Sequence, residues 1–123
     1  MNWLQYQILS LREILFYYFK KRICFRVEGS SMEPSLFIGD LVFVKKNTQG
    51  KLPKVNDLVV IVPPLSFSKD KTIMIKRVSS LGNHTFAVKS DNVLEGTDSR
   101  IFGSLTNEDL IGRVKFIRKT YPS

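Results

Sequence analysis

Cysteine is almost absent from the sequence, with Cys24 as its only example. A single cysteine excludes an internal disulfide and the paired cysteines of common zinc sites. Cys24 lies in the apolar run Ile23–Phe25, so we expect a buried structural thiol and not a nucleophile. A chain without disulfides is compatible with a reducing compartment, and we expect a cytoplasmic protein.

Long hydrophobic runs are also missing. The longest apolar run near the N-terminus is Ile14–Phe19, far short of the roughly 20 residues that a membrane-spanning helix needs. Arg12 and Glu13 interrupt the stretch before it. A secretory signal peptide fits poorly, because no basic region precedes an uninterrupted apolar one. We therefore expect no spanning segment.

Acidic residues are scarce relative to basic ones. Asp and Glu number 11 against 19 Lys and Arg, which gives a formal net charge of +8. Such a charge favours encounters with nucleic acid, anionic lipid or an acidic protein without choosing among them. The basic residues are scattered and no recognition motif accompanies them, so we favour a lysine-rich solvated surface and expect no specific nucleic-acid partner.

The 123 residues are enough for one domain with its own core. We expect residues 22–123 to form that domain and residues 1–21 to form an amphipathic helix before it. A helix docked on the domain is the favoured interpretation, and a peripheral membrane anchor is the alternative. The apolar residues that recur at helical spacing are Leu4, Ile8, Leu11, Leu15 and Tyr18.

From residue 22 onward, short β-like runs alternate with turn signals. Thr106–Asp109 is typical of a capped helical turn, and Pro63–Lys71 is the most loop-like stretch. Many short strands at this spacing predict a mainly β fold, a sandwich or small barrel. The expected strands are Ile23–Glu28, Leu41–Lys46, Asp57–Val62, Ile73–Ser80, Thr85–Lys89 and Ile111–Arg118.

The segment Val27–Leu36 is the densest in candidate chemistry. Gly29 and Ser30 directly precede Ser31, just after a predicted strand, and Pro34 restricts the backbone beyond it. This arrangement can expose a hydroxyl and direct adjacent backbone N–H groups at one point, as an oxyanion hole requires. An ordinary turn explains the same residues, and spacing alone favours the turn.

A nucleophilic serine needs a base. His84, the only histidine, lies in a turn-like segment, which disfavours a Ser-His-Asp triad. Lys76 alternates with Met74 and Val78 in a predicted strand, so the three side chains share one face. Burial among such neighbours favours the neutral amine that a lysine base requires. The alternative is a lysine extended into solvent, the commoner arrangement on a strand.

Several segments together resemble the type I signal peptidase (S26) family. In chain order, the similar segments are Ser31–Leu36 with Gly39–Asp40 for the nucleophile box, Ile75–Val78 for the general-base box, Ser90–Asn92, Asp98–Arg100 and Phe102–Gly103 for the last box, and finally Leu110–Val114. One box would be a weak signal, whereas the ordered set is a strong one. The resemblance implies a mainly β, barrel-like protease fold.

The resemblance also implies roles for individual residues. Ser31 would attack the scissile carbonyl and its backbone N–H would stabilise the oxyanion, while Lys76 would accept the proton and return it to the leaving amine. The supporting positions that match the family are Asp91 and Asn92, which would hold the turn leading to the site, and Asp98 and Arg100, which would form an ion pair beneath it.

Two positions depart from the bacterial pattern. Gly29 replaces a serine that contributes a hydroxyl to the oxyanion hole, and Gly96 replaces a serine that helps to orient the lysine. Ser30, Thr97 and Ser90 are the candidates to substitute for these hydroxyls.

The small size distinguishes this chain from classical signal peptidases, which have spanning helices and a second β-domain. It most resembles compact relatives that mature nickel-type superoxide dismutase by removing an N-terminal extension. The resemblance therefore implies a precursor protein as partner, and we expect no cofactor or metal in the protease itself. Two alternatives stay open: a general signal peptidase that contacts the membrane peripherally through residues 1–21, and a non-catalytic basic binding module.

Overall fold

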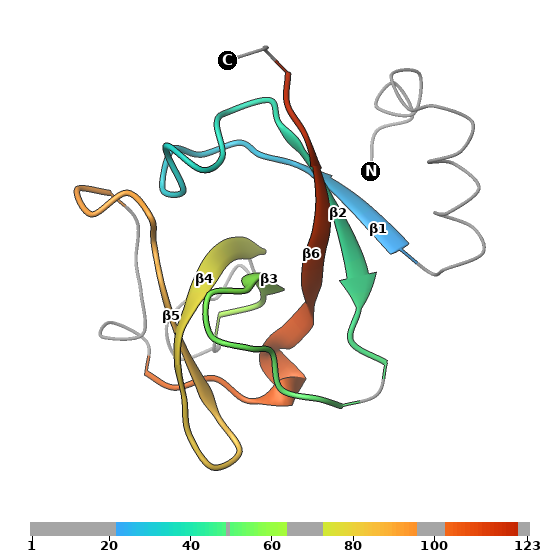
Figure 1. Ribbon diagram of the computed structural model, residues 1–123, viewed down its shortest axis with the longest axis vertical. Helices are drawn as coiled ribbons and strands as arrows, with labels where there is room; N and C mark the ends of the chain where they lie inside the picture. Colours follow the sequence, from blue (N-terminus) through green and yellow to red (C-terminus); the bar gives the residue numbers. More distant parts are fainter. Residues whose placement is uncertain (1–21, 49, 64–72, 96–102, 121–123) are drawn as a thin grey trace.

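The computed structural model describes residues 22–48, 50–63, 73–95 and 103–120. Within these residues, six strands form one sheet in the order β1-β2-β6-β3-β4-β5 (Figure 1). All neighbouring strands are antiparallel, and the predicted mainly β fold is confirmed. The elements are β1 (Arg22–Arg26), β2 (Leu41–Lys46), β3 (Leu58–Ile61), β4 (Met74–Leu81), β5 (Phe86–Lys89), the 3-10 turn η2 (Asn107–Asp109) and β6 (Leu110–Arg118).

The last strand lies in the middle of the sheet. β6 pairs with β2 on one side and with β3 on the other, so the end of the described chain joins the two halves of the sheet. At one end of β6, Arg118 pairs with Leu41, the first residue of β2. The residues after Arg118 therefore meet those that precede Leu41, as Figure 1 shows near the C-terminal end of the trace.

The predicted strands are all present, with small changes at their ends. β1 ends at Arg26, earlier than predicted, because Val27 turns away from the ladder and donates a backbone hydrogen bond to Asp40 O at 2.8 Å. Cys24 is buried in β1, as predicted. Thr106 caps η2 through a capping box, which confirms the predicted helical turn.

Some predictions fall on residues beyond those described. The amphipathic helix predicted for residues 1–21 and the loop-like residues 64–71 lie outside the described ranges. In the part of the chain that is described, no helix combines the length and hydropathy needed to cross a membrane.

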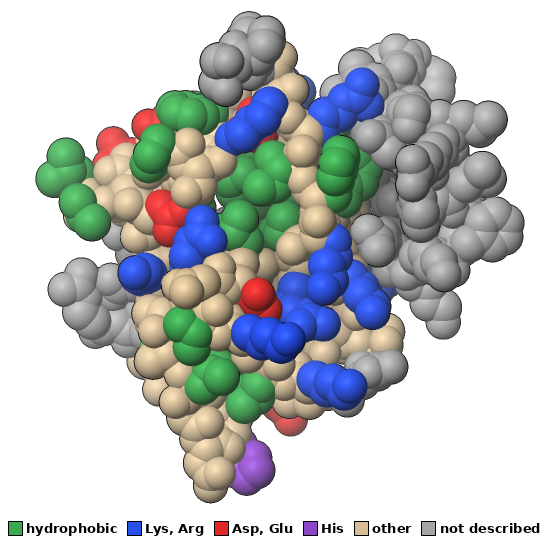
Figure 2. All heavy atoms as spheres, in the orientation of Figure 1, with side chains coloured by type: hydrophobic (Ala, Val, Ile, Leu, Met, Phe, Trp, Pro, Cys, Tyr) green, Lys and Arg blue, Asp and Glu red, His purple; other side chains and the backbone are tan. Residues whose placement is uncertain are grey.

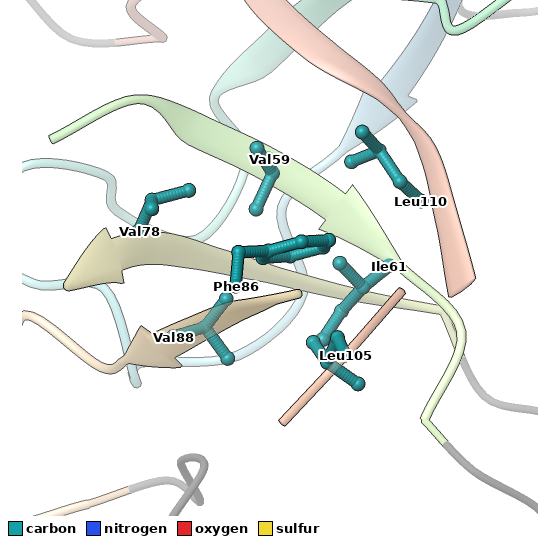
Figure 3. Close-up of a cluster of buried hydrophobic side chains, with 7 residues drawn as sticks. All are labelled: Val59, Ile61, Val78, Phe86, Val88, Leu105 and Leu110. Atoms are coloured by element: carbon teal, nitrogen blue, oxygen red, sulfur yellow. The ribbon is translucent and has the colours of Figure 1, made fainter. Parts of the chain in front are cut away.

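The described residues form two hydrophobic clusters, one on each face of the sheet. Adjacent residues of a strand point to opposite faces, and Val59 accordingly belongs to the first cluster and Val60 to the second. Phe86, 1% exposed, lies at the centre of the first (Figure 3). The second includes Met32 and Leu36 from the loop between β1 and β2. The loop that carries Ser31 is therefore anchored in the core.

β6 approaches β2 very closely at Gly112. A Cβ at this position would overlap Lys45 O and would lie 2.7 Å from Val44 Cγ1. Such spacing admits no side chain, which explains a glycine inside a strand. A register shift lies nearby in the same ladder, where Phe43 and Val44 pair with Phe116 and Val114, so the extra residue is in β6 and the bulge bends that strand.

Candidate active site

The loop Val27–Asp40 between β1 and β2, called the Ser31 loop below, carries the predicted nucleophile. Its first and last residues are joined by a backbone hydrogen bond of 2.8 Å. Met32 and Leu36, 2% and 0% exposed, insert their side chains into the second hydrophobic cluster. Ser31 itself is half-buried. Val27, before Ser31, belongs to the same cluster, so buried apolar side chains anchor the loop on both sides of the serine.

Lys76 is buried in β4, where it is only 3% exposed. Val59 of β3 pairs with it, and Val78 on the same face of β4 belongs to the first hydrophobic cluster. The burial predicted from the alternating pattern is therefore confirmed, and the alternative of a lysine extended into solvent is wrong. Lys76 Nζ donates a hydrogen bond of 2.7 Å to Ser90 Oγ, just beyond the end of β5.

The turn Ser90–Glu95 connects Lys76 with the Ser31 loop. Ser90 accepts the bond from Lys76, and Asn92 N donates to the backbone carbonyl of Ser31 at 2.8 Å. The Asn92 side-chain amide also donates to Ser30 O at 3.1 Å. The turn thus links Ser31 and Lys76 through its own hydrogen bonds to each of them.

Arg77 and Asp91 form a two-point ion pair beside this turn. The Arg77 nitrogens Nε and Nη2 lie 2.9 and 2.7 Å from the Asp91 carboxylate oxygens. Ser35 of the Ser31 loop donates to the same carboxylate at 2.5 Å. Hydrogen bonding from Arg77 holds the pKa of Asp91 below its ordinary value against the opposite effect of burial, and Ser35 contributes in the same direction.

The ion pair also shifts the pKa of its basic partner, Arg77. The hydrogen bond to Asp91 raises the pKa of Arg77 above its ordinary value, although burial opposes it. Arg77 also donates from Nη1 to Asn56 O at 2.9 Å. A charged, bidentate pair of this kind is among the stronger polar contacts in proteins. Because Ser35 of the Ser31 loop also donates to Asp91, the ion pair links β4 to this loop.

The remaining predicted site residues have different surroundings from one another. Gly29 is exposed, and a Cβ there would meet no atom within 4 Å. The Ser30 hydroxyl donates to the Glu95 carboxylate, whereas the Ser90 hydroxyl accepts a hydrogen bond from Lys76 Nζ. Among the described residues considered as partners of Lys76, Ser90 is in contact with it, whereas Ser30 binds Glu95. The predicted residues Gly96, Thr97, Asp98 and Arg100 lie outside the described ranges.

Sequence reasoning assigned no role to several residues that shape the site. Ser35 and Arg77 lie inside the nucleophile and general-base segments, and this position is the only sequence signal that marks them. Arg77 and Lys76 are adjacent in β4, and the Arg77 guanidinium binds Asp91, the turn residue next to Ser90. Lys119, which donates to Ser35 O and to Asp40 of the Ser31 loop, has no sequence signal. His84 is exposed in the turn between β4 and β5, as predicted.

Apolar side chains are exposed on the two segments next to Ser31. Phe37 and Ile38 of the Ser31 loop are 46% and 59% exposed, and Val93 and Leu94 of the turn are 92% and 89% exposed. Figure 2 shows exposed apolar side chains beside basic ones on this face of the molecule. Exposed apolar side chains that gather at one place mark contact sites for polypeptide or lipid.

Comparison with known families decides the class of protein. Residues 3–85 match the family model described as signal peptidase, peptidase S26. The match covers more than half of the chain and includes both Ser31 and Lys76. The chain belongs to the signal peptidase S26 family. Among curated proteins, none matches it.

Membership in the S26 family establishes the general activity, cleavage of peptide bonds by a serine endopeptidase. The family match ends at residue 85, before the turn that begins at Ser90. The turn lies outside the matched residues. Its hydrogen bonds to Lys76 and to Ser31 show that it belongs to the site.

Proposed function

We propose that this S26 protein is a Ser/Lys endopeptidase in which Ser31 is the nucleophile and Lys76 the general base. The observation that carries the proposal is the burial of Lys76, with its Nζ bonded to a turn that is itself bonded to the Ser31 backbone. A lysine base acts as the neutral amine, the form that burial among apolar side chains favours.

The proposed reaction has two steps. Ser31 Oγ attacks the scissile carbonyl carbon as its proton passes to Lys76 Nζ, and the Ser31 N–H donates to the oxyanion. The C–N bond then breaks, Lys76 returns the proton to the leaving amine, and an acyl-enzyme remains. In the second step Lys76 takes a proton from water as the water oxygen attacks the ester carbonyl carbon. The ester C–O bond then breaks, Lys76 returns the proton to Ser31 Oγ, and the new carboxylic acid leaves.

The proposed substrate is a precursor protein with an N-terminal extension, specifically the precursor of a nickel-type superoxide dismutase, cleaved in the cytoplasm. The sequence resemblance to the compact maturation proteases supports this choice. The exposed apolar side chains around Ser31 support a polypeptide as the binding partner. A basic chain of net charge +8 also favours encounters with acidic proteins.

The direct test is incubation of the purified protein with this precursor, with the new N-terminus identified by mass spectrometry. Ser31→Ala and Lys76→Met should each lower the rate by at least about 10³-fold. The matched controls are Ser80→Ala and Lys46→Met, both at exposed strand positions, and both should cleave normally. Circular dichroism should show that all four variants fold.

Two results would contradict parts of the proposal. Cleavage by Ser31→Ala or Lys76→Met at the normal rate would rule out the dyad. A Ser31-dependent cut in secretory precursors, with none in the superoxide dismutase precursor, would leave the dyad standing and would show that the substrate is wrong.

A second candidate function is that of a general signal peptidase working at a membrane surface. The exposed side chains of Phe37, Ile38, Val93 and Leu94 favour it, because exposed apolar groups on a basic protein suit an anionic lipid surface. Flotation with anionic vesicles would test it. Binding that is lost in Leu94→Ser but kept in Leu81→Ser, a control at another exposed leucine, would support this function, and absence of binding would exclude it.

A further inference from the structure

The residues that follow β6 contact the Ser31 loop at the end away from Ser31. Lys119 Nζ donates to Asp40 Oδ2 at 2.9 Å and to the backbone carbonyl of Ser35 at 2.6 Å. Thr120 N donates to Asp40 Oδ1 at 3.1 Å, and the Thr120 hydroxyl donates to Gly39 O. These contacts follow from the pairing of Arg118 with Leu41, which delivers the chain after β6 to this loop.

Asp40 is the buried partner in this contact, with a side chain only 3% exposed. Burial alone would raise the pKa of its carboxyl, but hydrogen bonds from Phe37 N, Lys119 and Thr120 N together hold that pKa below its ordinary value. Asp40 is therefore a carboxylate at neutral pH. A buried carboxylate that loses its cation is strongly destabilised, so the conformation of the loop around it depends on Lys119.

Ser35 is the residue at which two sets of contacts meet. Its carbonyl accepts from Lys119, and its hydroxyl donates to Asp91, the partner of Arg77. Asp91 directly follows Ser90, which bonds to Lys76. One continuous set of polar contacts therefore runs from Lys119 to the turn that holds Lys76.

The Lys119 ammonium has a further contact that fixes its position. It lies 5.6 Å from the centroid of the Phe37 ring, over the ring face, while the Lys119 side chain is 41% exposed. A cation placed in this way is attracted by the ring. Lys119 thus contacts Ser35, Phe37 and Asp40, which span the second half of the Ser31 loop.

We propose that Lys119 is a positioning residue of the peptidase, whose ammonium holds the Ser31 loop in the conformation that presents Ser31 to the turn bonded to Lys76. This inference rests on the proposed function of Ser31 and Lys76. Lys119 acts through Asp40 and Ser35 and does not contact the reacting atoms. A methionine at position 119 keeps the apolar stem but donates no hydrogen bond, whereas an arginine keeps the charge and the donors.

The kinetic test compares Lys119→Met, Lys119→Arg and the control Lys46→Met, which removes an equal charge from the exposed end of β2. Cleavage of the superoxide dismutase precursor gives kcat and KM. Lys119→Met should lower kcat about tenfold to a hundredfold, because small displacements of reacting groups cost that much, with KM within about twofold. Lys119→Arg should recover most of kcat, and Lys46→Met should match the wild type.

Amide hydrogen exchange tests the same inference without relying on cleavage. In Lys119→Met, the loop amides of Leu36, Gly39 and Asp40, which are bonded within the loop region, should exchange faster. The exchange rate of the Val60 amide, in the sheet, should be unchanged. A merely structural loss of stability would instead accelerate all of these amides together.

The outcomes separate this inference from the proposed function. If the wild type shows no Ser31-dependent cleavage, the proposed function fails, and the exchange data alone decide whether Lys119 holds the loop. If the wild type cleaves, a normal kcat in Lys119→Met, an equal loss in Lys119→Arg, or unchanged exchange in the loop would each overturn the positioning role.

Discussion

The Nζ of Lys76 lies 2.7 Å from Oγ of Ser90, and these two residues reach each other from β4 and from the turn after β5. Lys76 is almost completely buried, so a hydroxyl at this place helps to orient its amine. The sequence has glycine at position 96, where bacterial relatives have the serine expected to orient the lysine. Ser90 offers a hydroxyl of the same kind from a different position.

The first prediction concerns this hydroxyl. Ser90→Ala should lower kcat about tenfold to a hundredfold, because Lys76 loses a hydrogen bond that helps to orient its amine. Ser90→Thr, which keeps a hydroxyl, should recover much of the activity, and Ser80→Ala at an exposed site of β4 is the control. Steady-state cleavage kinetics provide the measurement. An unchanged kcat in Ser90→Ala would mean that another group orients Lys76.

The second prediction concerns acid stability. Asp91 has a pKa lowered by Arg77 in the folded protein, whereas an unfolded Asp titrates near about 3.9. Its contribution to stability is therefore fully present above that value and is lost as the pH falls through the lower folded pKa. At neutral pH, Asp91→Asn should cost about 1–3 kcal/mol, because a hydrogen bond to a charged partner is weakened.

Urea unfolding at a series of pH values checks this second prediction. The difference in unfolding free energy between wild type and Asp91→Asn should be constant at neutral pH and should shrink below about pH 4. Glu108→Gln, at an exposed position of η2, is the control and should follow the wild type. A difference that stays constant down to the acid limit of folding would disprove the stabilising role of the Asp91 carboxylate.

The third prediction concerns the close approach of β6 to β2. Gly112→Ala should destabilise the fold by about 1–3 kcal/mol or more, because the new Cβ overlaps backbone atoms of Lys45 that cannot move away easily. Gly29→Ala, where a Cβ meets nothing within 4 Å, should change stability by less than about 0.5 kcal/mol. Thermal unfolding compares the two. Equal melting temperatures for both variants would refute the predicted close contact.

The fourth prediction concerns the oxyanion hole and rests on the proposed dyad. Gly29→Ser restores the hydroxyl that bacterial relatives carry at this position, and the open space there accommodates it. We expect kcat to rise, by up to about 10²-fold if the hydroxyl reaches the oxyanion. Gly29→Ala should leave kcat unchanged. Equal kcat values for the serine and alanine variants would show that this chain uses a different second donor.

Much of the fold was predictable because strands leave a local signal. Alternating apolar residues marked the strand around Lys76, and the capping residues of Thr106–Asp109 marked η2. The candidate nucleophile was likewise local, since small residues and a proline surround Ser31 within one turn. The pairing order of the sheet was not predictable, because no short pattern records that β6 enters between β2 and β3.

The sequence by itself determined the mainly β class, the Ser31 segment and the two possible environments of Lys76. Tertiary structure alone decided that Lys76 is buried, because β3 places Val59 beside it and β5 brings Ser90 to its amine. It also decided that Lys119 supports the Ser31 loop, because the position of β6 carries that lysine to Asp40. Strand patterns depend on neighbours in the chain, whereas these contacts join residues that only the folded sheet brings together.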